Sequence, residues 1–514
     1  MFEFFSKSQK PAGKRSPESR QMADDHTLVS DLEENVDLIR RLFEDVDILR
    51  IKYIDSNCDK RLQYCIIYCD GVVDSKIISE NLIKPLTLSP ITRKGGDFVQ
   101  AVMNQIVQLN ETSITDSVEK IVEAVSYGDT VLFISGEDRA IILNTKEFHI
   151  RSVSEPDNER VMNGPREGFT EALMINLSLI RRKVLSADLK MKFRVMGRRT
   201  HTKICVLYME GLVNKQVLDE LYRRLDTVDM DGILDSNYLT EMTKDAPWSP
   251  FRTTGYTEKP DVVVGKLLEG RVAVIVDGSP VVMTVPYLFI ENFQSGEDYY
   301  LNYFYATFSR IIRILGFFMA ISVPAIYIAV GDFHQEMFPL QLFISIAAER
   351  QSVPLPAAVE AFVMVILFDI LRETGARMPS NVGQAMSIVG ALVIGQAAVQ
   401  AKLVAAPMII VVALTGISSL LVPKLNAPVI YIRLILLAAA STFGLFGVVL
   451  GFSALLVHLI NLKSFGVPHI STGKKLSYQN VKDSFMRGPW WTMITRPGFA
   501  ENRVRMKKSE KKHE

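Results

Sequence analysis

The stretch Ile314-Leu-Gly-Phe-Phe-Met-Ala-Ile-Ser-Val-Pro-Ala-Ile-Tyr-Ile-Ala-Val330 contains no charged side chain. With the isoleucines just before it, it is long enough to cross the roughly 30 Å hydrocarbon core of a bilayer as a helix. Arg310 and Arg313 lie at its start, and acidic residues follow its end. Because positive charges favour the cytoplasmic side, the sequence predicts an integral membrane protein whose preceding residues stay in the cytoplasm.

Further apolar segments predict a helical transmembrane domain over residues 305–462. They are Ala357–Leu371, Val382–Gln400, Leu403–Val422 and Leu434–Ile460. The run Phe338–Ala348 is also apolar but has only 11 residues. Its length fits a re-entrant or half-length element better than a full crossing.

The end of the chain restricts the number of crossings. Residues 463–514 contain 12 Lys and Arg against four Asp and Glu, which predicts a basic cytoplasmic tail. A cytoplasmic start and a cytoplasmic tail require an even number of crossings, whereas the long apolar segments number five. Either the short 338–348 element crosses, or the last segment is a hairpin bent near Gly444, Gly447 or Gly451. The sequence leaves both alternatives open.

Before the first apolar stretch, charged and apolar side chains are mixed as in soluble proteins. Residues 1–25 are polar and predict a flexible tail. Apolar residues then follow a 3-4-3-4-3 spacing from Val29 to Val46, which is typical of one face of a helix. Residues 26–160 are therefore predicted to form a soluble α/β subdomain with a leading helix.

An internal repeat indicates a second subdomain. Cys65, Tyr68, Gly71 and Val73 recur 140 residues later as Cys205, Tyr208, Gly211 and Val213, and Gly128–Gly136 matches Gly270–Gly278 at an offset of 142. Two matches at nearly one offset indicate a duplication. We predict a helical linker over residues 161–195, containing a helix at Glu167–Val184, and a second α/β subdomain over residues 196–300. The predicted fold class is α+β/α: two tandem related α/β soluble subdomains followed by a multi-span α-helical membrane domain.

Composition and motifs argue against several classes of function. The chain has 58 basic and 57 acidic residues, so no charge excess points to nucleic acid. Its four cysteines form no CxxC pair and have no histidine at ligand spacing, so we expect reduced thiols and no metal site. The sequence contains no Walker-type loop, GxSxG, HExxH or dinucleotide fingerprint. We therefore expect neither an enzyme nor a cofactor.

Charged residues on or beside Ala357–Leu371 define the candidate functional site. A charge at mid-bilayer costs at least about 2.5–3.5 kcal/mol on insertion scales, so it needs water or protein around it. Glu360 and Asp369 lie about half a turn apart around the helix axis and do not share one stripe. One face is predicted to line an ion path and the other to contact a neighbouring helix. The candidate path or gate comprises Val359, Glu360, Val363, Asp369 and Glu373, with Arg372 and Arg377 as ion-pair partners. The alternative is a charged cluster that only anchors the helix ends.

Small and amide side chains on the next apolar segment predict close packing between helices or subunits. They are Gly383, Gln384, Gly390, Gly395 and Gln396. Small residues allow two backbones to approach, and amides can form hydrogen bonds across the contact.

Several blocks of sequence resemble the A subunit of spore germinant receptors, the GerA family. The resemblance covers most of the chain, from residue 30 to residue 465, and is densest in the second half. The blocks are Asn57–Leu62, Gly164–Phe169, Asn176–Arg182, Gly197–Thr200, Leu268–Val272, Glu297–Tyr300, His334–Met337, Leu371–Glu373 and Ser387–Ala398. So many blocks in one order make the resemblance specific.

The resemblance implies a nutrient receptor in the inner membrane of the bacterial endospore, with the N-terminal domain and the C-terminal tail on the core side. It further implies a homo-oligomer, with a pentamer expected, that forms a germinant-gated monovalent cation channel surrounded by membrane lipids. Its implied partners are a transporter-like B subunit and a lipoprotein C subunit. Two other functions stay open: a membrane scaffold that couples a nutrient-binding subunit to a separate channel, and a secondary transporter.

The chain departs from the family pattern at the candidate site. That pattern is often Glu-Ala-Leu-Met-Met-Glu-x-x-Phe-Glu, whereas this chain has Glu360-Ala-Phe-Val-Met-Val365-Ile-Leu-Phe-Asp369. Val365 replaces the middle carboxylate, and Asp369 replaces a glutamate. If that carboxylate helps to set conduction, this chain conducts or gates differently, or it amplifies germination without sensing a nutrient itself.

Overall fold

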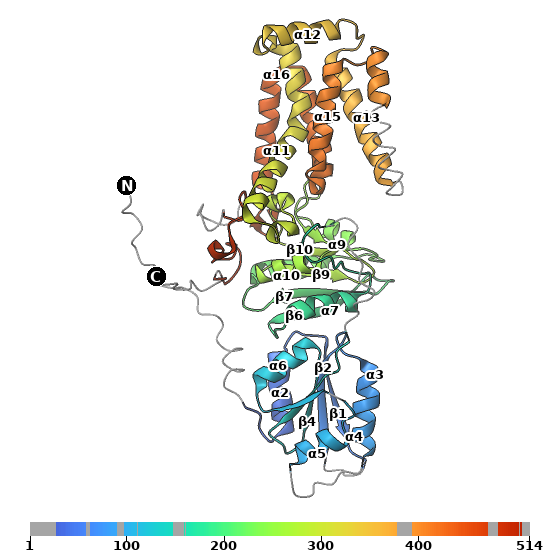
Figure 1. Cartoon of the computed structure of the whole chain (residues 1–514), viewed down its shortest axis with the longest axis vertical. Coiled ribbons are helices and arrows are strands. Elements are labelled where there is room, and N and C mark those ends of the chain that lie inside the picture. Colours follow the sequence, from blue (N-terminus) through green and yellow to red (C-terminus); the bar gives the residue numbers. More distant parts are fainter. Residues whose placement is uncertain are drawn as a thin grey trace, which may run out of the picture.

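A computed structural model describes residues 27–57, 62–89, 97–109, 111–147, 159, 161–377, 393–470, 482–502 and 504–505. Three layers follow one another along the long axis of the molecule (Figure 1). They are an N-terminal α/β unit, a second α/β unit and a helical region, in chain order. The predicted flexible tail at 1–25 lies outside the described residues.

The first unit is an antiparallel sheet flanked by helices (Figure 1). Its strands are β1 (Leu49–Asp55), β2 (Gln63–Cys69), β3 (Thr112–Thr115), β4 (Thr130–Ile134) and β5 (Ala140–Leu143), in the order β1-β2-β4-β5-β3. Its helices are α2 (Leu32–Leu42), α3 (Ser75–Ile78), η1 (Ser79–Ile83), α4 (Lys84–Leu88), α5 (Phe98–Gln105) and α6 (Val118–Tyr127). The apolar face of α2 buries Leu32, Val36 and Ile39, and Asp31 caps its first turn.

The second unit repeats this architecture. Its strands are β6 (Leu189–Met196), β7 (Thr202–Met209), β8 (Gly255–Thr257), β9 (Val272–Val276) and β10 (Val282–Val285), in the order β6-β7-β9-β10-β8. Its helices are α8 (Lys215–Thr227), α9 (Ser236–Met242) and α10 (Pro260–Leu268). The register repeats too, because Cys65 pairs with Phe133 in the first sheet and Cys205 pairs with Ile275 in the second. These pairs reproduce the sequence offsets of 140 and 142.

Helix α7 (Leu173–Lys183) lies between the units and is shorter at its start than the predicted 167–184 helix. It contacts α6 of the first unit and α10, β7 and β9 of the second. Arg181 of this helix is fully buried, and its Nη1 donates to the Ser186 carbonyl at 2.9 Å. One hydrophobic core therefore continues through α7 from the first sheet into the second.

The helical region contains α11 (Tyr303–Ile328), η4 (Ala329–Phe333), α12 (Leu340–Arg350), α13 (Ala357–Arg377), α15 (Ala406–Leu420) and α16 (Asn426–Asn461). Residues 393–400 are also helical. Among the described residues, two segments are long and apolar enough to cross a membrane, Tyr303–Phe333 and Pro423–Asn461. The short helix α12, which covers most of the predicted 338–348 element, lies across the end of the region farthest from the α/β units (Figure 1).

Helix α16 reverses direction at Gly444. This residue has φ 60° and ψ −140°, a backbone region that is open almost only to glycine. A Cβ on Gly451 would lie 2.4 Å from Leu436 Cδ2, so residues 15 positions apart lie side by side. In a straight helix these residues would be about 22 Å apart. Of the two sequence alternatives, the structure therefore has the hairpin.

The turn at Gly444 yields a stability prediction. We expect Gly444→Ala to lower the thermal unfolding midpoint in detergent, because a side chain in this conformation costs about 1–3 kcal/mol. The new Cβ would also lie 2.9 Å from Phe333 Cβ. Gly331→Ala is the control, because a Cβ there has no heavy atom within 4 Å. Equal midpoints for the two variants would contradict the hairpin.

Candidate functional site

Helix α13 exposes one continuous stripe. Val359, Val363, Ile366 and Ile370 follow the 4-3-4 spacing of one helix face, and each is about half exposed. Glu373 continues the same spacing toward the α/β units and pairs with Arg377 at 2.7 Å on an exposed turn. Within one chain this stripe is therefore apolar for four positions and charged at its end.

The opposite face of α13 is buried against neighbouring helices. Ala361 and Val365 are at most 1% exposed and pack in a cluster with Met408 of α15 and Leu437 of α16. Phe368 lies against Gly416 of α15, where a Cβ would come within 2.2 Å of the ring. Close packing on this face fixes the rotation of α13 about its axis.

Glu360 lies on the buried side of α13. It is 1% exposed, and its Oε1 accepts a hydrogen bond from the Ala405 amide at 2.5 Å. Ala405 is the N-cap residue of α15, where backbone amides carry a partial positive charge. The carboxyl group of Glu360 thus joins the start of α13 to the start of α15.

Asp369 forms an ion pair with Arg433 of α16. Arg433 is 1% exposed, and Asp369 also lies 3.4 Å from Arg372 of its own helix. Arg372 Nη1 in turn donates to Ser419 Oγ of α15 at 3.4 Å. This group therefore ties the middle of α13 to both neighbouring helices.

The structure separates the candidate residues into two groups. Val359, Val363 and Glu373 belong to the exposed stripe, whereas Glu360 and Asp369 face the interior of the chain. Arg433 was not predicted to be the partner of Asp369. The signal was present, because Arg433 is a single charge directly before the apolar run Leu434–Ile460.

The candidate packing residues are only partly described. Gly383, Gln384 and Gly390 lie outside the described residues. Gly395 faces α15, because a Cβ built on it would lie 3.9 Å from Ile409. Gln396 is exposed in the single chain. Among the residues that the structure describes, no group of three or more His, Cys, Asp or Glu is placed to hold a metal ion.

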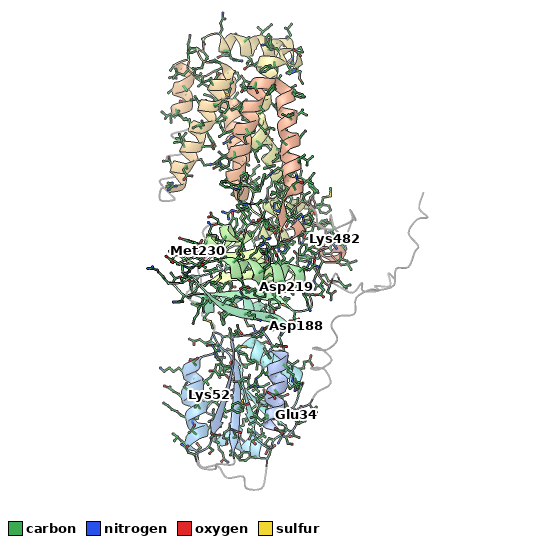
Figure 2. All side chains as sticks on the ribbon, turned by 180° about the vertical axis from the view of Figure 1, so that it is seen from behind. Glu34, Lys52, Asp188, Asp219, Met230 and Lys482 are labelled. Carbon is green, nitrogen blue, oxygen red and sulfur yellow. The ribbon has the colours of Figure 1, made fainter. Side chains whose placement is uncertain are left out.

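A buried ion network joins the helical region to the second α/β unit. Asp298 and Arg310 are fully buried and 2.8 Å apart, and Arg313 lies 2.9 Å from the other Asp298 oxygen. Arg310 also pairs at 2.9 Å with Asp483 of the C-terminal segment, which we define as residues 482–505. In Figure 2, Lys482 marks the start of this segment at the level where the second unit meets the helices. The first turns of α11 are therefore held by both the second unit and the C-terminal segment.

A second charged cluster joins the C-terminal segment to the second unit. Lys266, Arg271 and Glu291 are buried together, with Arg271 2.5 Å from Glu291. Burial lowers the pKa of Lys266 to about 8, although the negative charge of Glu291 opposes the shift. Glu269 beside this cluster pairs with Arg505 of the C-terminal segment at 2.8 Å.

A family model described as the Bacillus/Clostridium GerA spore germination protein matches residues 31–499. The chain belongs to the GerA family. This GerA-family chain is 41% identical to spore germination protein KA of Bacillus subtilis (strain 168), over 91% of this chain and 86% of that protein. It is 38% identical to the uncharacterized membrane protein YfkQ of the same organism, over 92% of each chain.

A solved structure is also similar to part of this GerA-family chain. It is the N-terminal domain of the A subunit of the Bacillus megaterium spore germinant receptor GerK3, at 28% identity and a TM-score of 0.42. The match covers 51% of this chain and 98% of that chain. From its family, the chain is a spore germination protein of the germinant-receptor type.

The Asp369–Arg433 pair predicts that Asp369 stabilises the fold, which a stability measurement can test independently of any contact with ions. Arg433→Met should lower the unfolding midpoint strongly, because removing one partner of a buried ion pair costs about 3–5 kcal/mol. Asp369→Asn should cost less stability in the Arg433→Met background than in the unmodified chain, because the pair is already lost there, whereas Arg372 is present beside Asp369 in both backgrounds. Arg377→Met is the control and should change stability by less than about 0.5 kcal/mol, because its pair with Glu373 is exposed. Losses of stability that simply add up in the double variant would disprove the pairing.

Proposed function

We propose that the chain is the membrane-embedded A-type subunit of a nutrient germinant receptor in the inner membrane of the endospore. Identical copies, five by the family resemblance, surround an axis and form a monovalent cation channel. A transporter-like B subunit and a lipoprotein C subunit complete the receptor. The observation that carries the channel proposal is the exposed stripe of α13, which is apolar from Val359 to Ile370 and ends at Glu373.

The path of the chain supports an even number of membrane crossings. Helix α11 leads away from the α/β units, and α13 leads back toward them from the distal helix α12 (Figure 1). Helix α15 is parallel to α13, because Glu360 meets Ala405 and Arg372 meets Ser419. Both helices therefore lead from the distal end toward the α/β units, and in the proposal the two halves of α16 add one crossing in each direction. An even number of crossings puts the C-terminal segment on the same side as the soluble units.

The composition of the α13 stripe suits a gated conduit. Rings of apolar side chains can close a pore by excluding water, and rings of carboxylates attract cations. In a ring of copies, Val359 and Val363 would form the narrow apolar part. Glu373, whose pair with Arg377 is exposed to water, would form the cation-attracting end, which faces the soluble units. Close packing of the α13 helices around the axis would then close the path, and wider packing would open it.

The proposal assigns a supporting role to Glu360 and Asp369. Both carboxyl groups are already engaged within one chain, by Ala405 and by Arg433. Their contacts orient the stripe toward the axis, and permeating ions do not need to meet them. The absence of a middle carboxylate at Val365 is compatible with this assignment, because Val365 is buried.

Cation flux from vesicles that contain the purified chain tests the proposal. Val363→Phe is expected to reduce the flux by tenfold or more, because a bulkier side chain obstructs an apolar constriction. Ile435→Phe on α16 is the control, because Ile435 is exposed and lies on the side of α16 opposite Arg433 and Leu437, which face α13. It should leave the flux unchanged.

Other outcomes point to other functions. Flux that is equal in Val363→Phe and in the unmodified chain would exclude the α13 stripe as the path. No flux from any form, with the chain purified as a monomer, would favour a scaffold that couples a nutrient-binding subunit to a separate channel. Flux that saturates with substrate and is coupled to a second solute would favour a transporter.

A further inference from the structure

The C-terminal segment is held against the start of α11. Tyr299 Oη donates to Asp483 at 2.8 Å, and the Arg487 amide donates to Thr307 Oγ1 of α11 at 3.2 Å. Arg487 is 4% exposed, and its guanidinium lies 5.1 Å from the ring centre of Trp490. The backbone around residue 487 is therefore fixed beside the junction between the second unit and the helices.

Next to these buried contacts, the same segment exposes a group of large apolar side chains. They are Phe485, Met486, Trp490 and Trp491, and the first turns of α11 add Phe304, Tyr305 and Phe308. Tyr303 connects the two groups, because its ring centre lies 5.8 Å from that of Trp491 and 4.1 Å from that of Phe304. The exposed aromatic side chains of the segment and of α11 thus form one patch, which we call the aromatic patch.

The position and composition of the aromatic patch are typical of a membrane–water interface. It lies at the base of α11, directly before the apolar run Ile314–Val330, so its surface continues into the surface of a candidate membrane span. Tryptophan and tyrosine concentrate where a bilayer meets water, because their rings are apolar and their N–H or O–H groups remain hydrated. Two of the three tryptophans of the chain occur here, side by side.

We propose that the aromatic patch is a lipid-contact site in which Trp490 and Trp491 lie at the headgroup level of the leaflet facing the soluble units. This proposal rests on the membrane placement in the proposed function. It assigns the C-terminal segment a task beyond that of a soluble tail. The segment fixes the depth of α11 in the bilayer while Asp483 holds Arg310.

Tryptophan fluorescence in vesicles of brominated phosphatidylcholine tests this contact. The variant Trp248→Phe leaves only Trp490 and Trp491 as reporters and does not touch the patch. Its emission should be quenched more by lipids brominated close to the headgroup than by lipids brominated near the bilayer centre. A chain in which all three tryptophans are phenylalanine has no tryptophan emission and is the blank for this measurement.

A tryptophan placed in the predicted bilayer centre distinguishes a failure of the lipid-contact proposal from a failure of the membrane placement. Ile435→Trp, in a chain whose three native tryptophans are phenylalanine, should be quenched most by the deep-brominated lipid. If Ile435→Trp is quenched and Trp490 and Trp491 are not, a protein surface covers the patch, and the lipid-contact proposal is overturned while the membrane placement stands. If neither position is quenched, both proposals are overturned. Shallow quenching of Trp490 and Trp491 supports the lipid contact whatever the result at Ile435.

Discussion

The rotation of α13 about its own axis is the constraint on which the functional account depends. Two buried interactions set it: Glu360 with the Ala405 amide near one end, and Asp369 with Arg433 in the middle. An unpaired buried charge would cost several kcal/mol, so α13 cannot turn without breaking a contact that is expensive to lose. As long as both contacts hold, the stripe from Val359 to Glu373 is the face that α13 offers to other molecules.

A second constraint connects this face to the soluble units. Asp298 forms ion pairs with Arg310 and Arg313 of α11, and Asp483 of the C-terminal segment also pairs with Arg310. Helix α11 packs against α15 and α16, which carry the partners of Glu360 and Asp369. Contacts therefore run without a break from the second α/β unit through α11 to the helices that hold α13.

Several features were predictable from the sequence because they depend on local periodicity or on repetition. The duplication was visible in the matched positions of Cys65 and Cys205, and the apolar run from Ile314 to Val330 identified α11. The reversal at Gly444 remained one of two alternatives, since glycine permits a turn without requiring it. The Asp369–Arg433 pair was not predicted, because it joins residues 64 positions apart whose meeting depends on how the helices pack. Arg310 was interpreted only as an orientation signal, because nothing in the sequence shows that it is buried.

Thiol accessibility at position 363 tests most directly whether the α13 stripe faces a water-filled path between copies. Cys65, Cys69 and Cys205 are buried, so a chain with Cys58→Ser and Val363→Cys carries one reactive thiol in the stripe. In reconstituted vesicles, a water-soluble cationic thiol reagent is predicted to modify this cysteine and to abolish cation flux. At Ile435→Cys, only a lipid-soluble reagent is predicted to react. If position 363 also reacts only with the lipid-soluble reagent, the stripe faces lipid and the channel account is contradicted.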